Sequence, residues 1–383
     1  MKKRLVILLL ALSMVGATAC SNRGDSTEVT EASTEVNTVE VSDYNYKDYV
    51  TLGQYTGFEV KVPTTTVSDD EVDQALEDLR NSNVTYEANG NTTVAKDDYV
   101  NMSYKLFKDG EELTDYSTDG TEIQVGAGSF FTDLENALVG MNVGEENSVD
   151  VSVADDYADS TLAGSTVTYQ VTINSIDNKV IPEATDDWIA TVSDSKTIDD
   201  WKAAKKSELE DSKKEEQKAV FKSGVQNDIM SYATFKDLPQ ELIDSQIEKY
   251  KTEDQKMADS MGYDFNEFIT NYYGYDDEDA YTEDLTSYVQ KSVQTDFVLQ
   301  ALRDAEGIEM TDDDLKSFED QCVQYYGFSD TDELLSYYGE DVVKAACLND
   351  KTWNTICDKN TMVEDENYYE EQGENSTVTT DQQ

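Results

Sequence analysis

The period of the apolar residues changes along this chain, and no other feature constrains its fold as strongly. Within residues 96–178 apolar and polar residues alternate, for example in the run Val100, Met102, Tyr104 and Leu106. Such alternation is typical of β-strands with one buried face. Within residues 179–363 the apolar residues follow the three- and four-residue spacing of amphipathic helices. The sequence therefore predicts an α+β chain, in which an antiparallel sheet around one short helix is followed by an all-α domain.

A strand–helix segment is expected at residues 48–95, ahead of the strand-rich domain. Its strand runs from Gly57 to Val62. Its helix begins at Ser68, because Ser68 and Glu71 have the spacing of a capping box.

Turn and cap signals also organise the strand-rich domain. Asp109-Gly110 predicts a hairpin turn. The short helix is expected from roughly Thr132 to Val139, where Gly140 closes it.

The N-terminus has the three parts of an export signal. Lys2, Lys3 and Arg4 precede an apolar stretch, which is followed by small residues and Cys20. The apolar stretch is too short for a bilayer core of ~30 Å, which needs about 20 residues. A cut directly before a lone Cys resembles the lipobox of bacterial lipoproteins, in which that Cys is diacylated, and two acyl chains anchor stably. We therefore expect residues 1–19 to be a signal peptide and Cys20 to be lipidated, on the extracytoplasmic side of the cell membrane.

Two segments lack the large apolar residues of a packed core. Residues 20–47 are expected to be the lipidated Cys and a disordered stalk, and residues 364–383 a disordered acidic tail.

Charge and composition exclude several classes of function. The net charge is −53, whereas binding to nucleic-acid phosphates requires Lys and Arg. Anionic lipid would also repel this chain, so the acyl anchor must hold it at the membrane. The chain has no histidine, which removes the usual base of Ser and Cys nucleophiles and the commonest metal ligand. No metal and no cofactor is expected.

The cysteines after the anchor are not expected to form a disulfide framework. Cys347 and Cys357 would lie on one helix about 15 Å apart, which is too far for a bridge. Cys322 could pair with either across a helix interface, but three buried thiols are favoured.

The strand-rich domain resembles FKBP-type peptidyl-prolyl isomerases from end to end. The motifs that carry the resemblance are, in order, Asp109-Gly110-Glu111-Glu112, Val125-Gly126-Ala127-Gly128-Ser129-Phe130-Phe131, Leu134-Glu135-Asn136-Ala137-Leu138-Val139-Gly140, Val143-Gly144-Glu145, Asp156-Tyr157, Leu162-Ala163-Gly164 and Thr166-Val167-Thr168-Tyr169-Gln170-Val171. The order of parts around this domain resembles the trigger factor family, through Tyr55–Val60 before it and Asp237–Ile243 in the helical domain. The basic ribosome-binding domain of that family has no counterpart here, so no ribosome is expected as a partner.

The resemblance implies a site and a mechanism. An X–Pro bond rotates slowly because its planar amide loses conjugation on twisting. A dry aromatic pocket favours the less dipolar twisted amide, and a backbone donor can hold its carbonyl. By position in the family pattern, the catalytic residues are Tyr104, Phe131 and Tyr169, and the substrate-binding residues are Leu113, Phe130, Leu134 and Tyr157. In the family the backbone N–H at Phe131 receives the substrate carbonyl.

Departures from the family pattern leave two functions open. One is Val153-Ala154, where the family has Phe-Pro; the others are at Leu113, Asp133 and Leu134. Members usually carry an aromatic residue at Leu113 and Leu134 and a glycine at Asp133. The first function is a membrane-anchored foldase that binds unfolded, proline-containing exported polypeptides and isomerises their X–Pro bonds. The second is a pure chaperone whose FKBP domain is catalytically degenerate. A parvulin-type foldase is disfavoured, because its pockets usually rely on histidines.

Overall fold

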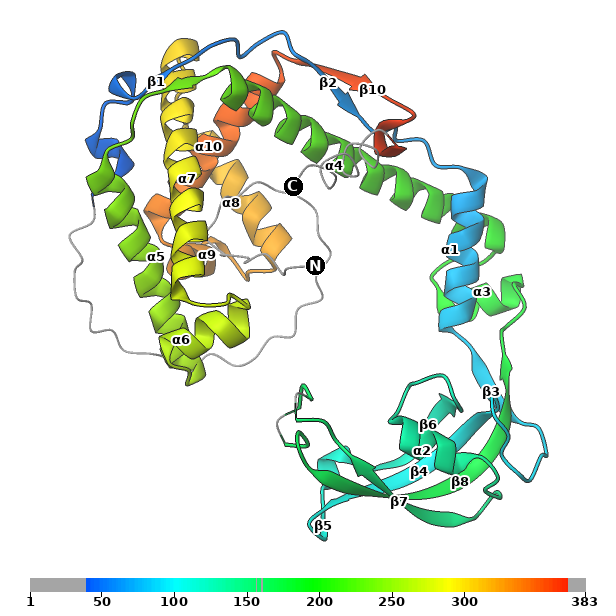
Figure 1. Cartoon of the computed structure of the whole chain (residues 1–383). Helices are drawn as coiled ribbons and strands as arrows, with labels where there is room; N and C mark the ends of the chain where they lie inside the picture. Colours follow the sequence, from blue (N-terminus) through cyan, green and yellow to red (C-terminus); the bar gives the residue numbers. More distant parts are fainter. Residues whose placement is uncertain (1–38, 156, 160, 371–383) are drawn as a thin grey trace. The chain divides into compact units, whose positions relative to one another are not determined.

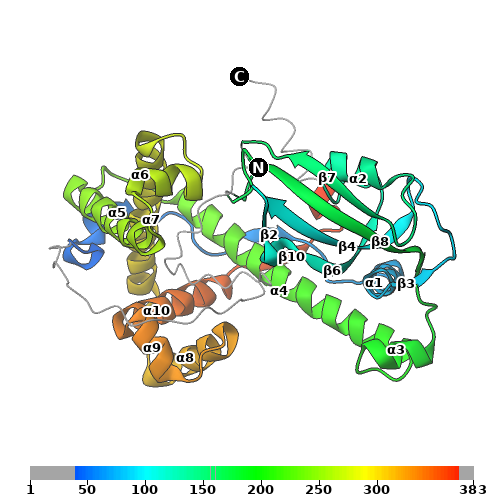
Figure 2. The ribbon, with the colours of Figure 1, turned by 90° about the horizontal axis from the view of Figure 1, so that it is seen from below.

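The computed structural model describes residues 39–155, 157–159 and 161–370 (Figures 1 and 2). These residues form two units, each of which is described by itself. The sheet unit comprises residues 67–209, and the helical unit comprises the described residues before and after it. The chain therefore enters the helical unit twice. The strand–helix segment expected at residues 48–95 is divided, because its first strands belong to the helical unit and its helix to the sheet unit.

The sheet unit is built on two long antiparallel strands, β4 (Tyr99–Lys108) and β8 (Thr166–Val180). The other strands are β3 (Thr85–Ala88) and β7 (Glu146–Ser152), which pair with β8, and β5 (Glu111–Glu112) and β6 (Thr118–Gln124), which pair with β4. All pairings are antiparallel. The predicted alternation is confirmed, because Val100, Met102 and Leu106 are at most 1% exposed and form the core of this sheet.

A single short helix, α2 (Thr132–Leu138), lies beside β7 (Figure 2). It buries Leu134 and Leu138 completely against the sheet. The hairpin turn is where the sequence predicted it, since Asp109 and Gly110 both have positive φ, 52° and 83°. The α+β fold expected from the sequence is confirmed.

Helices precede and follow the strands of the sheet unit along the chain. The first, α1 (Asp69–Ser82), begins with the predicted capping box, in which the Ser68 N–H donates to the Glu71 carboxylate over 2.9 Å. After β8 come α3 (Asp186–Val192) and the first part of the long α4 (Ile198–Tyr232). Arg80 Nε of α1 donates to the carbonyl of Pro182 over 2.8 Å, which ties α1 to the segment that leaves the sheet.

Glu122 of β6 and Asp177 of β8 form an electrostatically unfavourable pair on the sheet. Among the described residues, the buried atoms Glu122 Oε2 and Asp177 Oδ1 have no hydrogen-bond partner. The second oxygen of each carboxylate is satisfied, by Asn101 Nδ2 at 2.6 Å and Ser175 Oγ at 3.0 Å. Burial, together with the charge of Asp177, raises the pKa of Glu122 above its ordinary value.

Glu122→Gln should therefore stabilise the sheet unit by about 1 kcal/mol at pH 7, because an amide N–H can reach the unpaired oxygen of Asp177 without adding charge. When the pKa of a carboxyl is raised in the folded state, the folded protein becomes less stable as the pH rises through that pKa. The stability difference between Glu122→Gln and the wild type should therefore shrink at acidic pH. Urea denaturation of both proteins at pH 7 and pH 5 measures it. A variant less stable than the wild type at both pH values would contradict this account.

The helical unit packs its long helices around one large core. They are the second part of α4, α5 (Gln240–Met261), α7 (Glu278–Glu306) and α10 (Glu340–Cys357). Between α5 and α7 lie α6 (Phe265–Glu267) and a π-helical turn, η4 (Phe268–Tyr273). A smaller core joins α10 to α8 (Asp312–Tyr326) and α9 (Thr331–Tyr338). In the described part of the chain, no helix combines the length and the apolar composition needed to cross a membrane.

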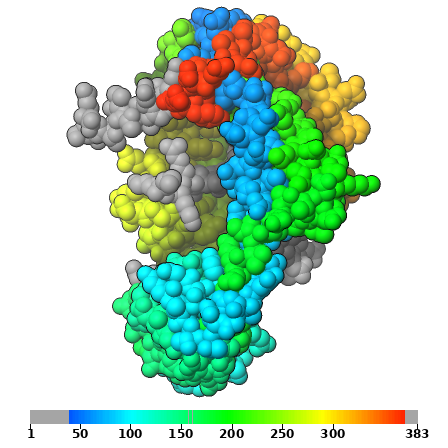
Figure 3. Space-filling view, turned by 90° about the vertical axis from the view of Figure 1, so that its right-hand side faces the viewer, coloured from blue at the N-terminus to red at the C-terminus, as the bar shows by residue number. Residues whose placement is uncertain are grey.

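Two short strand pairs accompany these helices. The first is antiparallel, between β1 (Val50–Thr51) and β9 (Thr234–Phe235); the second is parallel, between β2 (Glu59–Val62) and β10 (Thr361–Glu364). Figure 3 shows the second, where red residues near the C-terminus lie against blue residues near the N-terminus. Helix α4 packs closely on β2, since a Cβ on Gly224 of α4 would lie 2.4 Å from the side chain of Val60. The helical domain is thus confirmed. The strand expected from Gly57 to Val62 is present as β2, whereas its pairing with β10 and the β1–β9 pair were not predicted.

Two expected disordered segments are partly ordered. In the stalk predicted for residues 20–47, η1 (Val41–Asp43) and η2 (Tyr46–Asp48) are short 3-10 helices, and Val39 N donates to Ser245 Oγ over 2.9 Å. In the tail predicted for residues 364–383, Tyr369 donates to Glu216 over 2.6 Å. In the first segment Val41, Tyr44 and Tyr46 pack partly buried against the core of the helical unit, whereas Tyr369 in the second is 59% exposed. The rest of both segments, the signal peptide and Cys20 lie outside the described residues.

The three later cysteines are free thiols. Cys347 and Cys357 share α10, as predicted, and Cys322 lies on α8. Cys322 and Cys347 are buried, whereas Cys357 is partly exposed.

Candidate functional site

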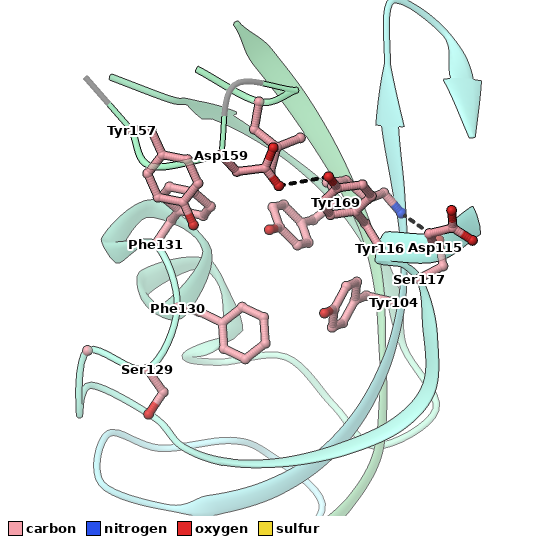
Figure 4. Close-up of a pocket in the computed structure, with 13 residues that line it drawn as sticks. Tyr104, Asp115, Tyr116, Ser117, Ser129, Phe130, Phe131, Tyr157, Asp159 and Tyr169 are labelled. Carbon is pink, nitrogen blue, oxygen red and sulfur yellow. Dashed lines mark hydrogen bonds between the residues drawn. The ribbon is translucent and has the colours of Figure 1, made fainter. Parts of the chain in front are cut away.

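An open cavity of about 580 Å³ lies in the sheet unit (Figure 4). Two central strands and three connecting segments line it: β4, β8, the η3 turn (Thr114–Tyr116) with Ser117, the loop before α2, and the loop after β7. The lining residues are Tyr104, Leu106, Asp115, Tyr116, Ser117, Gly128, Ser129, Phe130, Phe131, Tyr157, Asp159, Leu162 and Tyr169.

Aromatic rings make up much of the cavity wall. Tyr169 lies among them, with its ring centroid 5.3 Å from that of Tyr104 and 6.3 Å from that of Phe131. Phe130 contacts Tyr104 edge to face at 5.6 Å, and Phe131 contacts Tyr157 at 5.4 Å. These separations are those of favourable aromatic pairs. The rings therefore support one another around a preformed space.

Burial keeps the central hydroxyls neutral. Loss of solvent around Tyr169 raises its pKa to about 12, and burial also raises the pKa of Tyr104. At physiological pH both rings thus present an uncharged, weakly polar surface.

Glu135 of α2 holds the loop that presents Phe130 and Phe131. Glu135 is 4% exposed, and its carboxylate accepts the backbone N–H groups of Gly126, Gly128 and Phe130 at 2.9, 3.1 and 2.8 Å. Burial alone would raise the pKa of Glu135, but these backbone donors outweigh it and lower the pKa below its ordinary value. The loop is thus built around a charged carboxylate.

The N–H of Phe131 is left for another acceptor. Within the described part of the chain it makes no hydrogen bond, whereas the preceding N–H, of Phe130, is held by Glu135. An unpaired backbone donor beside an aromatic cavity can bind a carbonyl oxygen.

Five of the seven predicted pocket residues line the cavity: Tyr104, Phe130, Phe131, Tyr157 and Tyr169. Their catalytic and substrate-binding roles remain predictions.

Leu113 and Leu134 are not among the lining residues. Leu134 is 0% exposed and lies in the core between α2 and the sheet, so its predicted contact with substrate is wrong. Leu113 is half-buried and packs against the same core. Asp133 is exposed in the first turn of α2 and is also absent from the lining.

Sequence reasoning missed the polar part of the lining, Asp115, Tyr116, Ser117 and Asp159. Tyr116 follows Leu113 by one turn of η3, so the structure supplies a ring just beyond the position where the family has one. An aromatic residue three positions after Leu113 was the available signal. For Asp159 the available signal was its place between the Asp156-Tyr157 and Leu162-Ala163-Gly164 motifs, two residues after the predicted pocket residue Tyr157.

Over the described residues, no group of three or more His, Cys, Asp or Glu side chains is arranged to hold a metal ion. The cavity wall combines rings, two carboxylates and backbone groups. Such a wall suits the non-covalent binding of a peptide segment.

Comparisons with known proteins agree with this site. The family model described as "FKBP-type peptidyl-prolyl cis-trans isomerase" matches residues 90–174, and that described as "Bacterial trigger factor protein (TF) C-terminus" matches residues 197–358.

Curated relatives match across both units. Trigger factor of Limosilactobacillus reuteri (strain DSM 20016) is 30% identical over 312 residues, which cover 80% of this chain and 68% of the relative. Trigger factor of Geobacillus kaustophilus (strain HTA426) is 28% identical over 316 residues, covering 82% and 72%. A solved structure described as "Promiscuous Substrate Recognition in Folding and Assembly Activities of the Trigger Factor Chaperone" is similar with a TM-score of 0.48 and 17% identity, over 80% of this chain and 71% of that one. The chain belongs to the trigger factor family and carries that family's FKBP-type peptidyl-prolyl isomerase domain.

Proposed function

We propose that this trigger factor relative works outside the cytoplasm as a lipid-anchored foldase. Its helical unit would hold unfolded exported polypeptides, and its sheet unit would isomerise their X–Pro bonds. The observation that carries the proposal is the preformed aromatic cavity, in which Tyr104, Phe131 and Tyr169 lie together. Its volume of about 580 Å³ leaves room for a proline ring and its neighbours.

The chemistry follows from this wall. The neutral rings of Tyr104 and Tyr169 exclude water from the prolyl amide, which favours the twisted, less dipolar state. The free N–H of Phe131 can hold the rotating carbonyl, and no proton or electron pair has to move to a side chain. A thousandfold acceleration would require about 4 kcal/mol of preferential binding to the twisted amide.

A proline-limited refolding assay with the mature full chain tests the isomerase activity. Phe131→Ala should reduce the catalysed rate at least about tenfold, because about 1.4 kcal/mol of lost transition-state binding already has that effect. Phe107→Ala is the matched control, since Phe107 is a half-buried Phe of β4 outside the cavity lining. A wild-type chain that does not accelerate refolding would contradict the isomerase activity and favour a pure chaperone.

One observation favours that second candidate. Tyr325, Tyr326 and Tyr337 of α8 and α9 are 51, 40 and 72% exposed. With Phe328 and Tyr338 they form a continuous set of ring contacts, which we call the aromatic patch. Tyr side chains offer large contact area with a polar edge, which suits weak binding of exposed apolar segments in unfolded chains.

An aggregation assay tests the contribution of the aromatic patch to chaperone activity separately from isomerisation. The double variant Tyr325→Ser, Tyr337→Ser should suppress the aggregation of a denatured client less well than the wild type, while its X–Pro activity on short peptides stays unchanged. Tyr232→Ser is the control, because Tyr232 is 55% exposed outside the patch. Unaltered suppression by the double variant would remove the patch from the proposal.

The anchor is supported by the sequence of residues 1–20, which lie outside the described residues. When the full gene is expressed in a bacterium, we expect the protein in the membrane fraction, with a diacylated Cys20 detectable by mass spectrometry. Cys20→Ser should abolish acylation. A wild-type protein that carries no lipid and stays soluble in the cytoplasm would contradict the anchor.

A further inference from the structure

We infer that the hydrogen bond between Tyr116 and Asp159 is a latch that holds the cavity in its binding-competent form. This inference rests on the proposed isomerase function of the same site. The Tyr116 hydroxyl donates to Asp159 Oδ2 over 2.7 Å, and both residues line the cavity (Figure 4). They come from separate walls, since Tyr116 ends η3 and Asp159 lies in the loop after β7. The bond therefore joins two cavity segments across 43 residues of sequence.

Asp159 also organises its own loop. Its Oδ1 atom accepts the N–H of Thr161 at 2.8 Å. Its backbone carbonyl accepts the N–H groups of Leu162 and Ala163 at 3.0 and 2.9 Å. One residue thus fixes the local turn with one carboxylate oxygen and its carbonyl, and leaves the other oxygen for Tyr116.

The charge on Asp159 strengthens this link. The Tyr116 hydroxyl, followed by the N–H of Thr161, holds the pKa of Asp159 below its ordinary value. The carboxylate is therefore ionised at neutral pH and makes a charge-assisted bond, which is stronger than one between neutral groups.

The latch acts through Tyr157, two residues before Asp159. Tyr157 faces Phe131 across the cavity but is 42% exposed, so the core does not hold it. Leu162 anchors the far part of its loop in the core, and the rest is held by polar contacts, among them the latch and a bond from Lys108 Nζ to the carbonyl of Thr161. Tyr116 and Asp159 are thus positioning residues for the ring of Tyr157. Without the latch the loop spends part of its time away from Phe131. The apparent affinity for the peptide then falls in proportion to the fraction of molecules that keep the binding-competent form.

Tyr116→Phe isolates this effect, because it keeps the ring and removes only the hydroxyl. In the full mature chain we expect KM for a proline-containing peptide to rise about three- to tenfold while kcat changes less than about twofold, since the latch alters the competent population and not the twisted amide. Asp159→Ala should act similarly, and Asp159→Asn, which keeps one acceptor oxygen, should restore part of the affinity. Tyr99→Phe is the matched control, on β4 outside the cavity lining.

Hydrogen exchange gives a readout that does not depend on activity. In Tyr116→Phe the amides of Thr161 and Ala163 should exchange faster, while amides of β4 and β8 keep their protection. Unchanged KM and unchanged exchange in this variant would overturn the latch. So would a uniform loss of protection with a fall in kcat, because that result indicates a general structural role. If the wild type proves inactive, the proposed isomerase function fails, and the exchange result alone decides whether the latch exists.

Discussion

Glu135→Ala is expected to destabilise the sheet unit by about 3 kcal/mol and to remove most isomerase activity. The change removes the charged acceptor of three partly buried backbone donors, the N–H groups of Gly126, Gly128 and Phe130, and each such hydrogen bond contributes about 1 kcal/mol. It also releases the loop that positions Phe131. Urea denaturation and the proline-limited refolding assay measure the two effects. A stable variant with wild-type activity would contradict the role assigned to Glu135.

The pH dependence provides an independent check with Glu135→Gln. The folded pKa of Glu135 lies below its ordinary value of 4.5, so the unfolded chain takes up a proton first as the pH falls. The stabilisation is fully present above about pH 4.5 and is lost as the pH falls through the lowered folded pKa. Glu135→Gln keeps a single acceptor oxygen and no charge. It should therefore be less stable than the wild type at pH 7, and the difference should narrow below about pH 4.

Asp254→Ala should destabilise the helical unit by about 2–4 kcal/mol, because it leaves the buried hydroxyl of Tyr281 and the half-buried hydroxyl of Tyr273 unpaired. Asp254 of α5 is 6% exposed and accepts the hydroxyls of Tyr273 at 2.7 Å and Tyr281 at 2.5 Å. Burial first, and then the bond to Asp254, raises the pKa of both tyrosines. The network therefore joins α5, η4 and α7 through one carboxylate. Urea denaturation followed by far-UV circular dichroism measures the loss.

Tyr281→Phe is the matched control for this network. It removes one donor, leaves Asp254 bound to Tyr273, and should cost only about 1 kcal/mol. If Asp254→Ala costs no more than Tyr281→Phe, the two hydroxyls find other partners and the network does not hold these helices together.

Local signals in the sequence were reliable wherever a few neighbouring residues decide the conformation. The capping box at Ser68 and Glu71 and the hairpin at Asp109-Gly110 are present as predicted. Each depends on bonds or backbone angles within four residues, so the rest of the chain has little influence on it.

Family position was a weaker guide to side-chain contacts. Leu134 aligns with a pocket position but is completely buried, because α2 packs it against the sheet. Tyr116 and Asp159 line the cavity but lie on short connecting segments without periodicity. Their contact depends on how two loops meet, and no pattern of neighbouring residues encodes that meeting.

The sequence by itself determined the α+β plan and the strand-rich and helical parts, because alternation and helical spacing record which faces are buried. Five aromatic residues of the cavity were expected only from their position in the family pattern. The sequence is also the whole basis for the expected anchor at Cys20. The tertiary structure alone decided how β1 and β2 pair with β9 and β10 in the helical unit. Strands as short as β1 and β2 have no stability of their own, and they form because β9 and β10 supply their partners beside a core that covers both. The strand at β2 was predicted from the local sequence, but its partner was not, because β10 lies about 300 residues away and the pairing forms only when the core is assembled.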